Sequence, residues 1–286
     1  MKKFFAVLLM FVFCASLIGS MVSCGASKAI QVIDVRLTDE SYAFAVAEGN
    51  AQLQASLNAY LKTIKENGTL DAIMKKYFDN VGTKVGVTAG EADASKDQFV
   101  VATNVPFSPF EYLGDDNLFY GIDIEIAKGY AESIGKELVI KNIINFDDIF
   151  TEITTGKADV GMAGITYSAD RDKTLDFTDT YFNASQKLIV LESDTTFDNC
   201  KTLEDVENIL KSWNKDKSVG YQNGTTGNLY VEGDIDWGFA GFPVTCKGYD
   251  TAVMAAQDLI NGNLAAVVVD EAPAVYIVSA INGVNK

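Results

Sequence analysis

Two oppositely charged side chains stand next to turns that could hold a small zwitterion. Arg171 follows an apolar segment by way of Gly164 and Thr166. Its guanidinium is planar and can bind a carboxylate through two parallel hydrogen bonds. Asp270 ends a second apolar segment, and a carboxylate at the end of a strand suits an ammonium group. Each also has an ordinary explanation, because Arg171 could form a surface ion pair and Asp270 could cap a helix.

Two loops could complete such a site. The segment 224–227 (GTTG) lies between a predicted strand and a predicted helix, where free backbone N–H groups attract an anion. It lacks the lysine of a nucleotide-binding P-loop, and it could equally be a plain strand-to-helix turn. The segment 104–110 (NVPFSPF) follows another predicted strand, and its two prolines stiffen the loop that carries Phe107 and Phe110. These two rings could face a ligand or belong to the core.

The composition excludes several classes of protein. Among the 286 residues, 23 Lys and Arg stand against 39 Asp and Glu, which gives a formal charge of −16. This charge repels phosphate backbones and argues against nucleic-acid binding. The absence of histidine removes Ser-His-Asp and Cys-His nucleophile systems and histidine-based zinc sites. The four cysteines form no C-x-x-C pair, so we expect neither a metal site nor a cofactor.

The segment 1–23 has the pattern of a secretory signal peptide. Lys2 and Lys3 precede an apolar run over 4–18, which is short for a membrane span. The ending 21–24 (MVSC) resembles a bacterial lipobox, so we expect Cys24 to become the lipidated N-terminus. Simple secretion with Cys24 free is the alternative.

Two cysteines, Cys200 and Cys246, remain in the mature chain. Because an extracytoplasmic compartment is oxidising, we predict a disulfide between them. Two buried thiols in one lobe are the alternative.

The hydrophobic periodicity alternates between strands and helices along most of the chain. Apolar positions recur at the helical spacing of three and four in several segments, separated by short apolar runs typical of buried strands. The clearest predicted helices are 53–64, 122–134 and 252–260, and the clearest predicted strands are 99–103, 218–221 and 264–269. This order predicts an α/β fold with mainly parallel sheets, in two lobes joined near residue 187. The segment 81–97 is rich in Gly, Ala, Ser and charge and is predicted to be a linker or a long surface loop.

Five segments resemble, in order, the motifs of the type II solute-binding proteins of bacterial amino-acid ABC importers (extracellular solute-binding protein family 3). The resemblance covers nearly all of the mature chain and implies a two-lobe periplasmic-binding-protein fold with a ligand cleft between the lobes. The five segments are 104–112 (NVPFSPFEY), 121–127 (GIDIEIA), 158–181 (ADVGMAGITYSADRDKTLDFTDTY), 220–230 (GYQNGTTGNLY) and 261–273 (NGNLAAVVVDEAP).

One block of this resemblance stands out of order. Residues 37–78 resemble the C-terminal end of the family but come first here, and the chain ends soon after Asp270. This order predicts a circular permutation, in which the segment 81–97 joins the family's usual ends. After the signal peptide 1–23, the expected domains are a continuous lobe 1, 45–187, and a discontinuous lobe 2, 26–44 with 188–286.

The resemblance implies a role for each residue around the backbone of the ligand. Arg171 matches the arginine that binds the α-carboxylate, assisted by the backbone N–H groups of Thr166 and Thr226. Asp270 matches the acid that binds the α-ammonium group, assisted by the Gly164 carbonyl and the Thr166 hydroxyl.

Four further residues match the pocket for the ligand side chain. Phe107 and Phe146 match its aromatic walls, and Asn104 and Gln222 offer amide groups. Asn104 stands where binders of basic amino acids and of glutamine often carry an acid, and an amide cannot neutralise a cation. A neutral polar ligand such as glutamine is therefore the first expectation, with glutamate, cystine and apolar amino acids still open.

The resemblance implies a lipid-anchored monomer that captures a free L-amino acid and delivers it to an ABC permease in the membrane. A binding protein that reports to a sensor, a lipoprotein that has lost its ligand, and a dehydratase-like enzyme on the same fold are the alternatives. The enzyme would need a general acid in the cleft, for which Glu271 is the obvious candidate.

Overall fold

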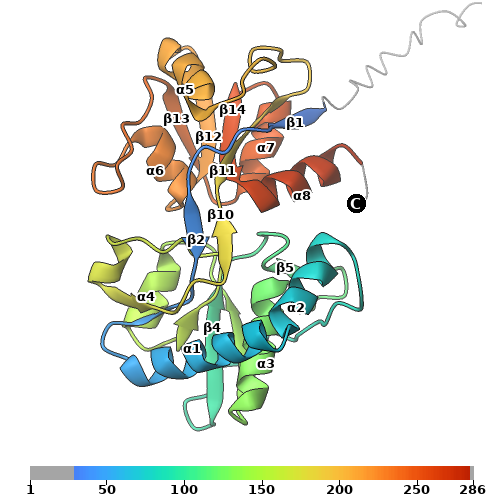
Figure 1. Cartoon of the computed structure of the whole chain (residues 1–286), viewed down its shortest axis with the longest axis vertical. Coiled ribbons are helices and arrows are strands. Elements are labelled where there is room, and N and C mark those ends of the chain that lie inside the picture. Colours follow the sequence, from blue (N-terminus) through green and yellow to red (C-terminus); the bar gives the residue numbers. More distant parts are fainter. Residues whose placement is uncertain (1–28, 284–286) are drawn as a thin grey trace, which may run out of the picture.

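The computed structural model describes residues 29–283 and divides them between two lobes (Figure 1). A five-stranded sheet forms the centre of each lobe, with helices packed on both faces. The predicted signal peptide 1–23 and Cys24 lie outside the described residues. Within residues 29–283, no helix combines the length and the apolar character needed to cross a bilayer.

The sheet of lobe 1 has the strand order β7-β4-β8-β3-β9. Strand β4 runs parallel to β7 and β8, and β3 runs antiparallel to β8 and β9. Helices α1, α2 and α3 cover one face and α4 covers the other. The bounds are β3 Ala45–Ala47, α1 Ala51–Glu66, α2 Thr69–Phe78, β4 Gln98–Thr103, β5 Tyr112–Leu113, β6 Phe119–Tyr120, α3 Ile122–Ser133, β7 Glu137–Asn142, α4 Asp148–Thr154, β8 Val160–Gly161, the 3-10 helix Arg171–Lys173, and β9 Leu175–Phe177.

The sheet of lobe 2 has the order β1-β11-β14-β12-β13. Strand β12 runs parallel to β13 and β14, and β11 runs antiparallel to β14 and β1. Helices α5 and α6 cover one face, and α7 and α8 cover the other. The bounds are β1 Ile30–Ile33, β11 Gln186–Leu191, α5 Leu203–Ser212, β12 Ser218–Gln222, α6 Thr226–Glu232, β13 Thr245–Tyr249, α7 Ala252–Ile260, β14 Ala266–Asp270, and α8 Glu271–Ile281.

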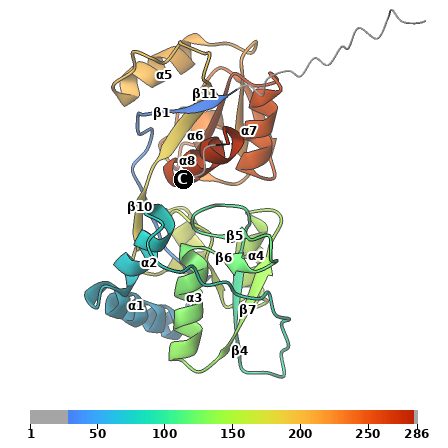
Figure 2. The same ribbon diagram turned by 90° about the vertical axis from the view of Figure 1, so that its right-hand side faces the viewer.

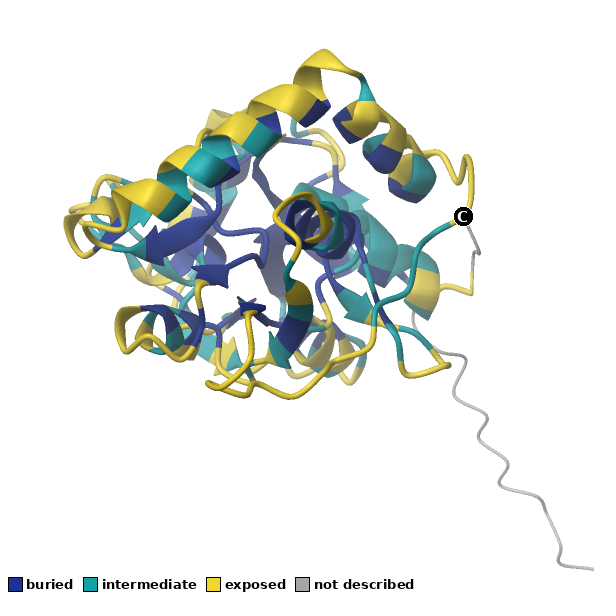
Figure 3. Cartoon of the chain, turned by 90° about the horizontal axis from the view of Figure 1, so that it is seen from below, coloured by how far each residue is buried: buried dark blue, intermediate teal, exposed yellow. Residues whose placement is uncertain are grey.

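Helix α1 illustrates how the sequence builds these layers. Its side-chain cap is Asn50, whose Oδ1 accepts the N–H of Leu53 at 3.3 Å. It buries Leu57, Leu61 and Ile64 at the spacing of one helical face. Figure 3 shows the same division on the outer helices, which expose one side and bury the other against the dark blue strands. Removing one of these side chains, as in Leu61→Ala, costs about 2–5 kcal/mol of folding stability.

Two short strands connect the lobes. β2 (Glu40–Tyr42) and β10 (Phe182–Ala184) pair antiparallel between the two sheets, as Figures 1 and 2 show. The strand β2 ends at Tyr42, and the chain continues as a separate strand, β3, in the sheet of lobe 1. The break occurs because the N–H of Ala43 is donated to Ile165 O and that of Phe44 to Thr178 Oγ1, at 3.0 Å each.

The segment 81–97 is mostly exposed but is attached to lobe 1 at defined points. Val87 and Phe119 exchange two backbone hydrogen bonds of 2.9 and 2.7 Å, and Ile140 N donates to Ala89 O at 2.7 Å. The two ends of the described chain also meet. The side-chain amide of Asn282, just past α8, accepts from Ile30 N at 3.1 Å and donates to Ile30 O at 2.8 Å.

The expected disulfide is absent from the structure, where Cys200 and Cys246 are free thiols. Both are half-buried against the same apolar cluster of lobe 2, and the Cys246 thiol donates to Val244 O at 3.8 Å. Burial raises the pKa of each thiol. The two thiols therefore pack against the same apolar cluster of lobe 2 without a bond between them.

Candidate functional site

The predicted site residues meet in one narrow cavity between the lobes. It lies where the carboxyl ends of strands from both sheets face each other, the usual place for a ligand in α/β proteins. The lining includes all nine residues expected to bind the ligand, although their contacts with a ligand stay a prediction. The lining residues are Asn104, Phe107, Glu111, Phe146, Ala163, Gly164, Thr166, Arg171, Gln222, Thr225, Thr226 and Asp270.

Arg171 reaches from lobe 1 to the backbone of lobe 2. Its Nη1 donates to Thr166 O at 2.8 Å and its Nη2 donates to Gly224 O at 3.1 Å. Burial lowers the pKa of Arg171 to about 10, against the opposing effect of Asp147. The guanidinium therefore stays charged at neutral pH and faces the cavity from the side of lobe 1.

Gly224 allows this close approach of the lobes. Its φ of +74° lies in the left-handed region, and a Cβ there would fall 2.3 Å from Asp147 Oδ1. No side chain fits between the Gly224 backbone and Asp147. The backbone of lobe 2 thus lies directly against a side chain of lobe 1 next to Arg171.

Asp270 stands at the end of β14 in lobe 2, opposite Arg171, and is buried. Its Oδ1 accepts the hydroxyl proton of Tyr42 at 2.6 Å. Burial raises the pKa of Asp270 to about 7, with a further increase from the nearby Glu40 and a smaller opposing effect from Tyr42. The carboxyl therefore changes its charge near neutral pH.

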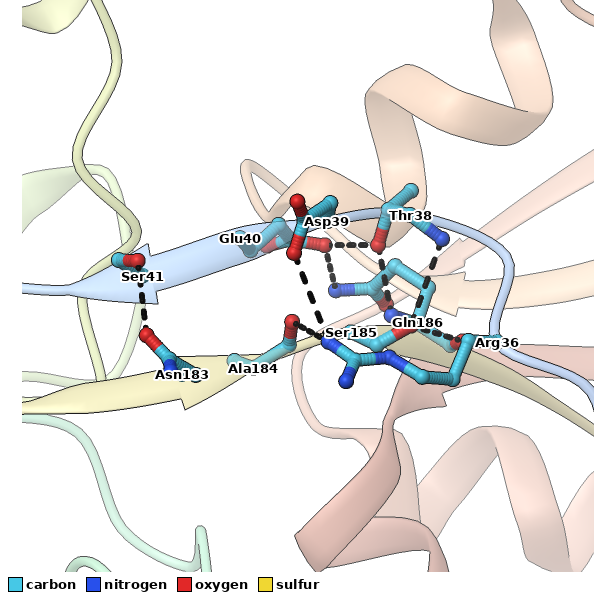
Figure 4. Close-up of polar contacts among 9 residues, drawn as sticks. All are labelled: Arg36, Thr38, Asp39, Glu40, Ser41, Asn183, Ala184, Ser185 and Gln186. Atoms are coloured by element: carbon cyan, nitrogen blue, oxygen red, sulfur yellow. Dashed lines mark hydrogen bonds and ion pairs between the residues drawn. The ribbon is translucent and has the colours of Figure 1, made fainter.

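Glu40 is a buried carboxylate beside the site that the sequence did not single out. It lies on hinge strand β2, and Figure 4 shows its contacts within the hinge. Its Oε1 accepts from Gln186 Nε2 at 3.1 Å and from the Thr38 hydroxyl. Its Oε2 accepts from Thr166 Oγ1 at 2.7 Å. The Thr166 hydroxyl is thus directed to the hinge, whereas the resemblance assigned it to a ligand ammonium group.

Gly164 is held in place by a buried carboxyl group of lobe 1. Its N–H donates to Asp123 Oδ2 at 2.9 Å, and Tyr181 donates its hydroxyl proton to Asp123 Oδ1 at 2.6 Å. The φ of Gly164 is +54°, and a Cβ there would fall 2.5 Å from the ring of Phe107. Glycine is therefore required at this position on the cavity wall, against the ring of Phe107.

The two amide side chains bond to each other across the cleft. Gln222 Nε2 donates to Asn104 Oδ1 at 2.8 Å. Asn104 Nδ2 donates to Ile143 O at 2.7 Å and to Ile144 O at 2.9 Å. Both protons of the Asn104 amide are committed to the protein, so its role is to join the lobes and shape the pocket.

Glu111 is the most unusual group on the cavity. It is fully buried at 0% exposure, and neither carboxyl oxygen has a hydrogen-bond partner. Burial, together with Asp123 and Asp270, raises its pKa well above the usual range. An unpaired buried carboxyl is costly, and this one lines the cavity between the lobes. The sequence signal was an acid inside the segment 104–112, which was otherwise assigned to aromatic walls.

Glu271, the acid candidate for an enzyme, lies elsewhere. It pairs with Lys187 at 3.5 Å and lines a separate cavity between α2 and α8. Among residues 29–283, no group of three acidic, cysteine or histidine side chains is arranged to hold a metal ion. The described cleft presents one guanidinium and several buried carboxyl groups.

The chain is similar in sequence and in structure to several amino-acid-binding proteins. The arginine-binding extracellular protein ArtP of Bacillus subtilis (strain 168) is 29% identical over 143 residues, which are 50% of this chain and 51% of that protein. The chain thus spans about half the length of this relative. Among solved structures, an ancestral arginine-binding protein bound to glutamine is 32% identical, with a TM-score of 0.55 over 66% of this chain and 76% of that one. The ancestral amino acid-binding protein AncCDT-1, a precursor of cyclohexadienyl dehydratase, is 26% identical, with a TM-score of 0.55 over 75% of this chain and 78% of that one.

The matching segment contains most of the described site. Residues 99–256 match the pattern of bacterial extracellular solute-binding proteins, family 3, and this range includes Asn104, Glu111, Arg171 and Gln222. The chain belongs to the bacterial extracellular solute-binding proteins, family 3.

Proposed function

We propose that this protein captures a free amino acid between its lobes and delivers it to an ABC permease. The observation that carries the proposal is the placement of Arg171 and Asp270, of opposite charge and from different lobes, on one buried cavity. A zwitterion binds both groups at once and therefore favours the closed arrangement. Three or four charge-assisted hydrogen bonds of about 1.5–3 kcal/mol each, less the entropy of capture, support a Kd of about 1 μM.

We infer that the ligand side chain ends in nitrogen donors, and that a positive charge suits the site best. Glu111 supplies two unpaired oxygens, and the single guanidinium of Arg171 faces the carboxyl groups of Glu111 and Asp270. The sequence argument against cationic ligands considered Asn104 alone, whose amide donors are already used within the protein. Glutamine, the first expectation from the sequence, is the second candidate because its amide can also donate to Glu111.

The anchoring and the chain order are part of the same proposal. Lipidation of Cys24 would attach the protein to a bacterial membrane through a short spacer before β1, and the protein would act as a monomer. A circular permutation is supported by the contact between Asn282 and Ile30, since it makes the two ends of the described chain neighbours. The domain bounds 45–187 for lobe 1, and 26–44 with 188–286 for lobe 2, belong to this proposal.

Calorimetric titration of the protein without its first 24 residues, stripped of ligand by partial unfolding and dialysis, tests the function. We expect micromolar binding of arginine or lysine, weaker binding of glutamine, and little binding of citrulline, the neutral analogue of arginine. Binding of a cation should release a proton from Glu111, which is measured by repeating the titration in buffers of different ionisation enthalpy. Absence of binding by all twenty amino acids would overturn the proposal, whereas preference for glutamine would overturn the charge assignment alone.

A further inference from the structure

A loop of lobe 2 carries a tryptophan onto the guanidinium of Arg171. The loop follows α6 and is closed by two backbone hydrogen bonds of 2.9 and 2.8 Å between Asp234 and Phe239. Its base is fixed to α6, because the ring of Phe239 packs edge-on against Tyr230 at 5.4 Å. Within the turn, Trp237 N donates to Asp234 Oδ1 at 3.1 Å. The loop is therefore a defined structure that holds Trp237 in one place.

Three aromatic rings surround the guanidinium carbon of Arg171. Phe146 and Phe150 of lobe 1 lie at 5.4 and 5.1 Å, and Trp237 of lobe 2 lies at 5.1 Å. These distances are within the range of cation–π attraction, which is strongest for tryptophan. Since Arg171 belongs to lobe 1, the contact with Trp237 can exist only while the lobes are close together.

Trp237 also lines a second space in the cleft, and its ring contacts Arg171 of the ligand cavity. That neighbouring cavity, of about 460 Å³, shares Thr166 and Thr226 with the ligand site and has Trp237 in its lining, whereas Arg171 lines the ligand site. Without the indole ring, Arg171 would be open to this space. Water would then compete for the guanidinium donors that a ligand carboxylate needs.

We propose that Trp237 is a positioning residue that locks onto Arg171 when the lobes close and slows the release of the ligand. The inference rests on the proposed function, since it concerns the lifetime of the closed, ligand-bound state. Trp237 does not need to touch the ligand. Together with Phe146 and Phe150 it packs around the guanidinium, restricts its movement and excludes water from it.

The chain offers a clean spectroscopic test, because it contains only two tryptophans. Trp213 packs against Phe197 in lobe 2 at 5.7 Å, so Trp213→Phe leaves Trp237 as the reporter. In that background, arginine should change the emission of Trp237 and protect it from acrylamide quenching. Stopped-flow displacement should show release about tenfold faster in Trp237→Ala than in the wild type, with association changed less than twofold.

Two controls keep the result interpretable. Trp237→Tyr retains an aromatic ring and should restore most of the slow release, and Trp213→Phe should release at the wild-type rate. Circular dichroism and thermal unfolding check that each variant folds. If the wild type binds but Trp237→Ala releases ligand within twofold of the wild-type rate, the inference is wrong and the proposed function stands. If the wild type binds no amino acid, both are wrong.

Discussion

The two lobes repeat one arrangement of strands. In lobe 1, β4 lies between parallel neighbours β7 and β8, and β3 then runs antiparallel to its two neighbours, β8 and β9. In lobe 2, β12 lies between parallel neighbours β13 and β14, and β11 then runs antiparallel to its two neighbours, β14 and β1. The chain crosses between the lobes twice, from β1 through β2 to β3 and from β9 through β10 to β11. Two similar frameworks therefore present the same strand ends to one cavity.

The lobes differ in the groups that they place at these equivalent ends. The chain leaves β8 into the glycine turn that leads to Arg171, whereas β14 ends on the carboxylate of Asp270. The ends of β4 and β12 carry amides, Asn104 and Gln222, which bond to each other. The ends of β8 and β14 thus provide groups of opposite charge, whereas the amides at the ends of β4 and β12 join the lobes. The two halves of a repeated framework therefore differ in charge, as the proposed zwitterion site requires.

Removing either charged group should weaken ligand binding more than any other change. We expect Arg171→Ala and Asp270→Asn each to weaken amino-acid binding at least 100-fold, because each loses two charge-assisted bonds and leaves the opposite group unpaired. Calorimetric titration measures the loss. Lys173→Ala is the matched control, since Lys173 lies in the same 3-10 helix but is exposed and pairs with Asp170. Equal loss in the control would indicate a general disturbance of the helix.

Glu111 should determine which side chain the site accepts. We expect Glu111→Gln to weaken arginine binding by about 10- to 100-fold, because a buried ion pair is lost. Citrulline binding should stay the same or improve, so the arginine-to-citrulline ratio is the decisive measurement. The variant should also reduce the proton release on binding to the part that comes from Asp270. An unchanged ratio would show that Glu111 has a purely structural role.

The sequence predicted which residues each lobe contributes to the site better than it predicted the contacts between distant residues. All nine predicted site residues line the cavity, because each sits in a local pattern of strand, turn and glycine that a sequence displays. Glu40 and Trp237 were missed, since their importance comes from contacts with distant residues, Glu40 with Thr166 and Trp237 with Arg171. Glu111 was within a recognised segment, but only the structure shows that its oxygens lack partners.

The sequence also predicted only part of the fold. The long helices and buried strands were predictable from periodicity, whereas the two- and three-residue strands β5, β6, β9 and β10 are too short to show a pattern. The disulfide expectation was wrong because a chain position and an oxidising compartment do not fix the separation of two sulfurs.

The affinity should depend on pH through the ionisation of Asp270. Its pKa of about 7 in the ligand-free protein means that acid protonates the group that must bind the ligand ammonium. We expect affinity to fall as the pH decreases below about 7, by up to about tenfold per pH unit. Tyr42→Phe removes a hydrogen bond that favours the carboxylate, so the midpoint should move to higher pH. Calorimetry between pH 5 and 8 would contradict this if the affinity did not change.

Asp123 should act on stability over the same pH range. Burial raises its pKa to about 7 from an unfolded value of 3.8, so the folded protein retains a proton that the unfolded chain has lost. Stability should therefore fall as the pH rises from about 4 to about 7, by up to about 1.4 kcal/mol per pH unit from this group. Thermal unfolding of ligand-free protein measures the slope. Asp123→Asn should flatten it, and an unchanged slope would assign the effect to other carboxyl groups.

Reversing the proposed circular permutation should have the smallest effect. A variant would join residue 283 to residue 29 through a linker of about four Gly and Ser residues and open the chain between Glu91 and Ala92. Asn282 already contacts Ile30, and the pairing of Val87 with Phe119 would be kept. We expect ligand affinity within about twofold of the original, because every contact between the lobes is preserved and only loop-closure entropy changes. Loss of folding or a tenfold weaker affinity would mean that the chain order itself is needed to hold the two lobes in place.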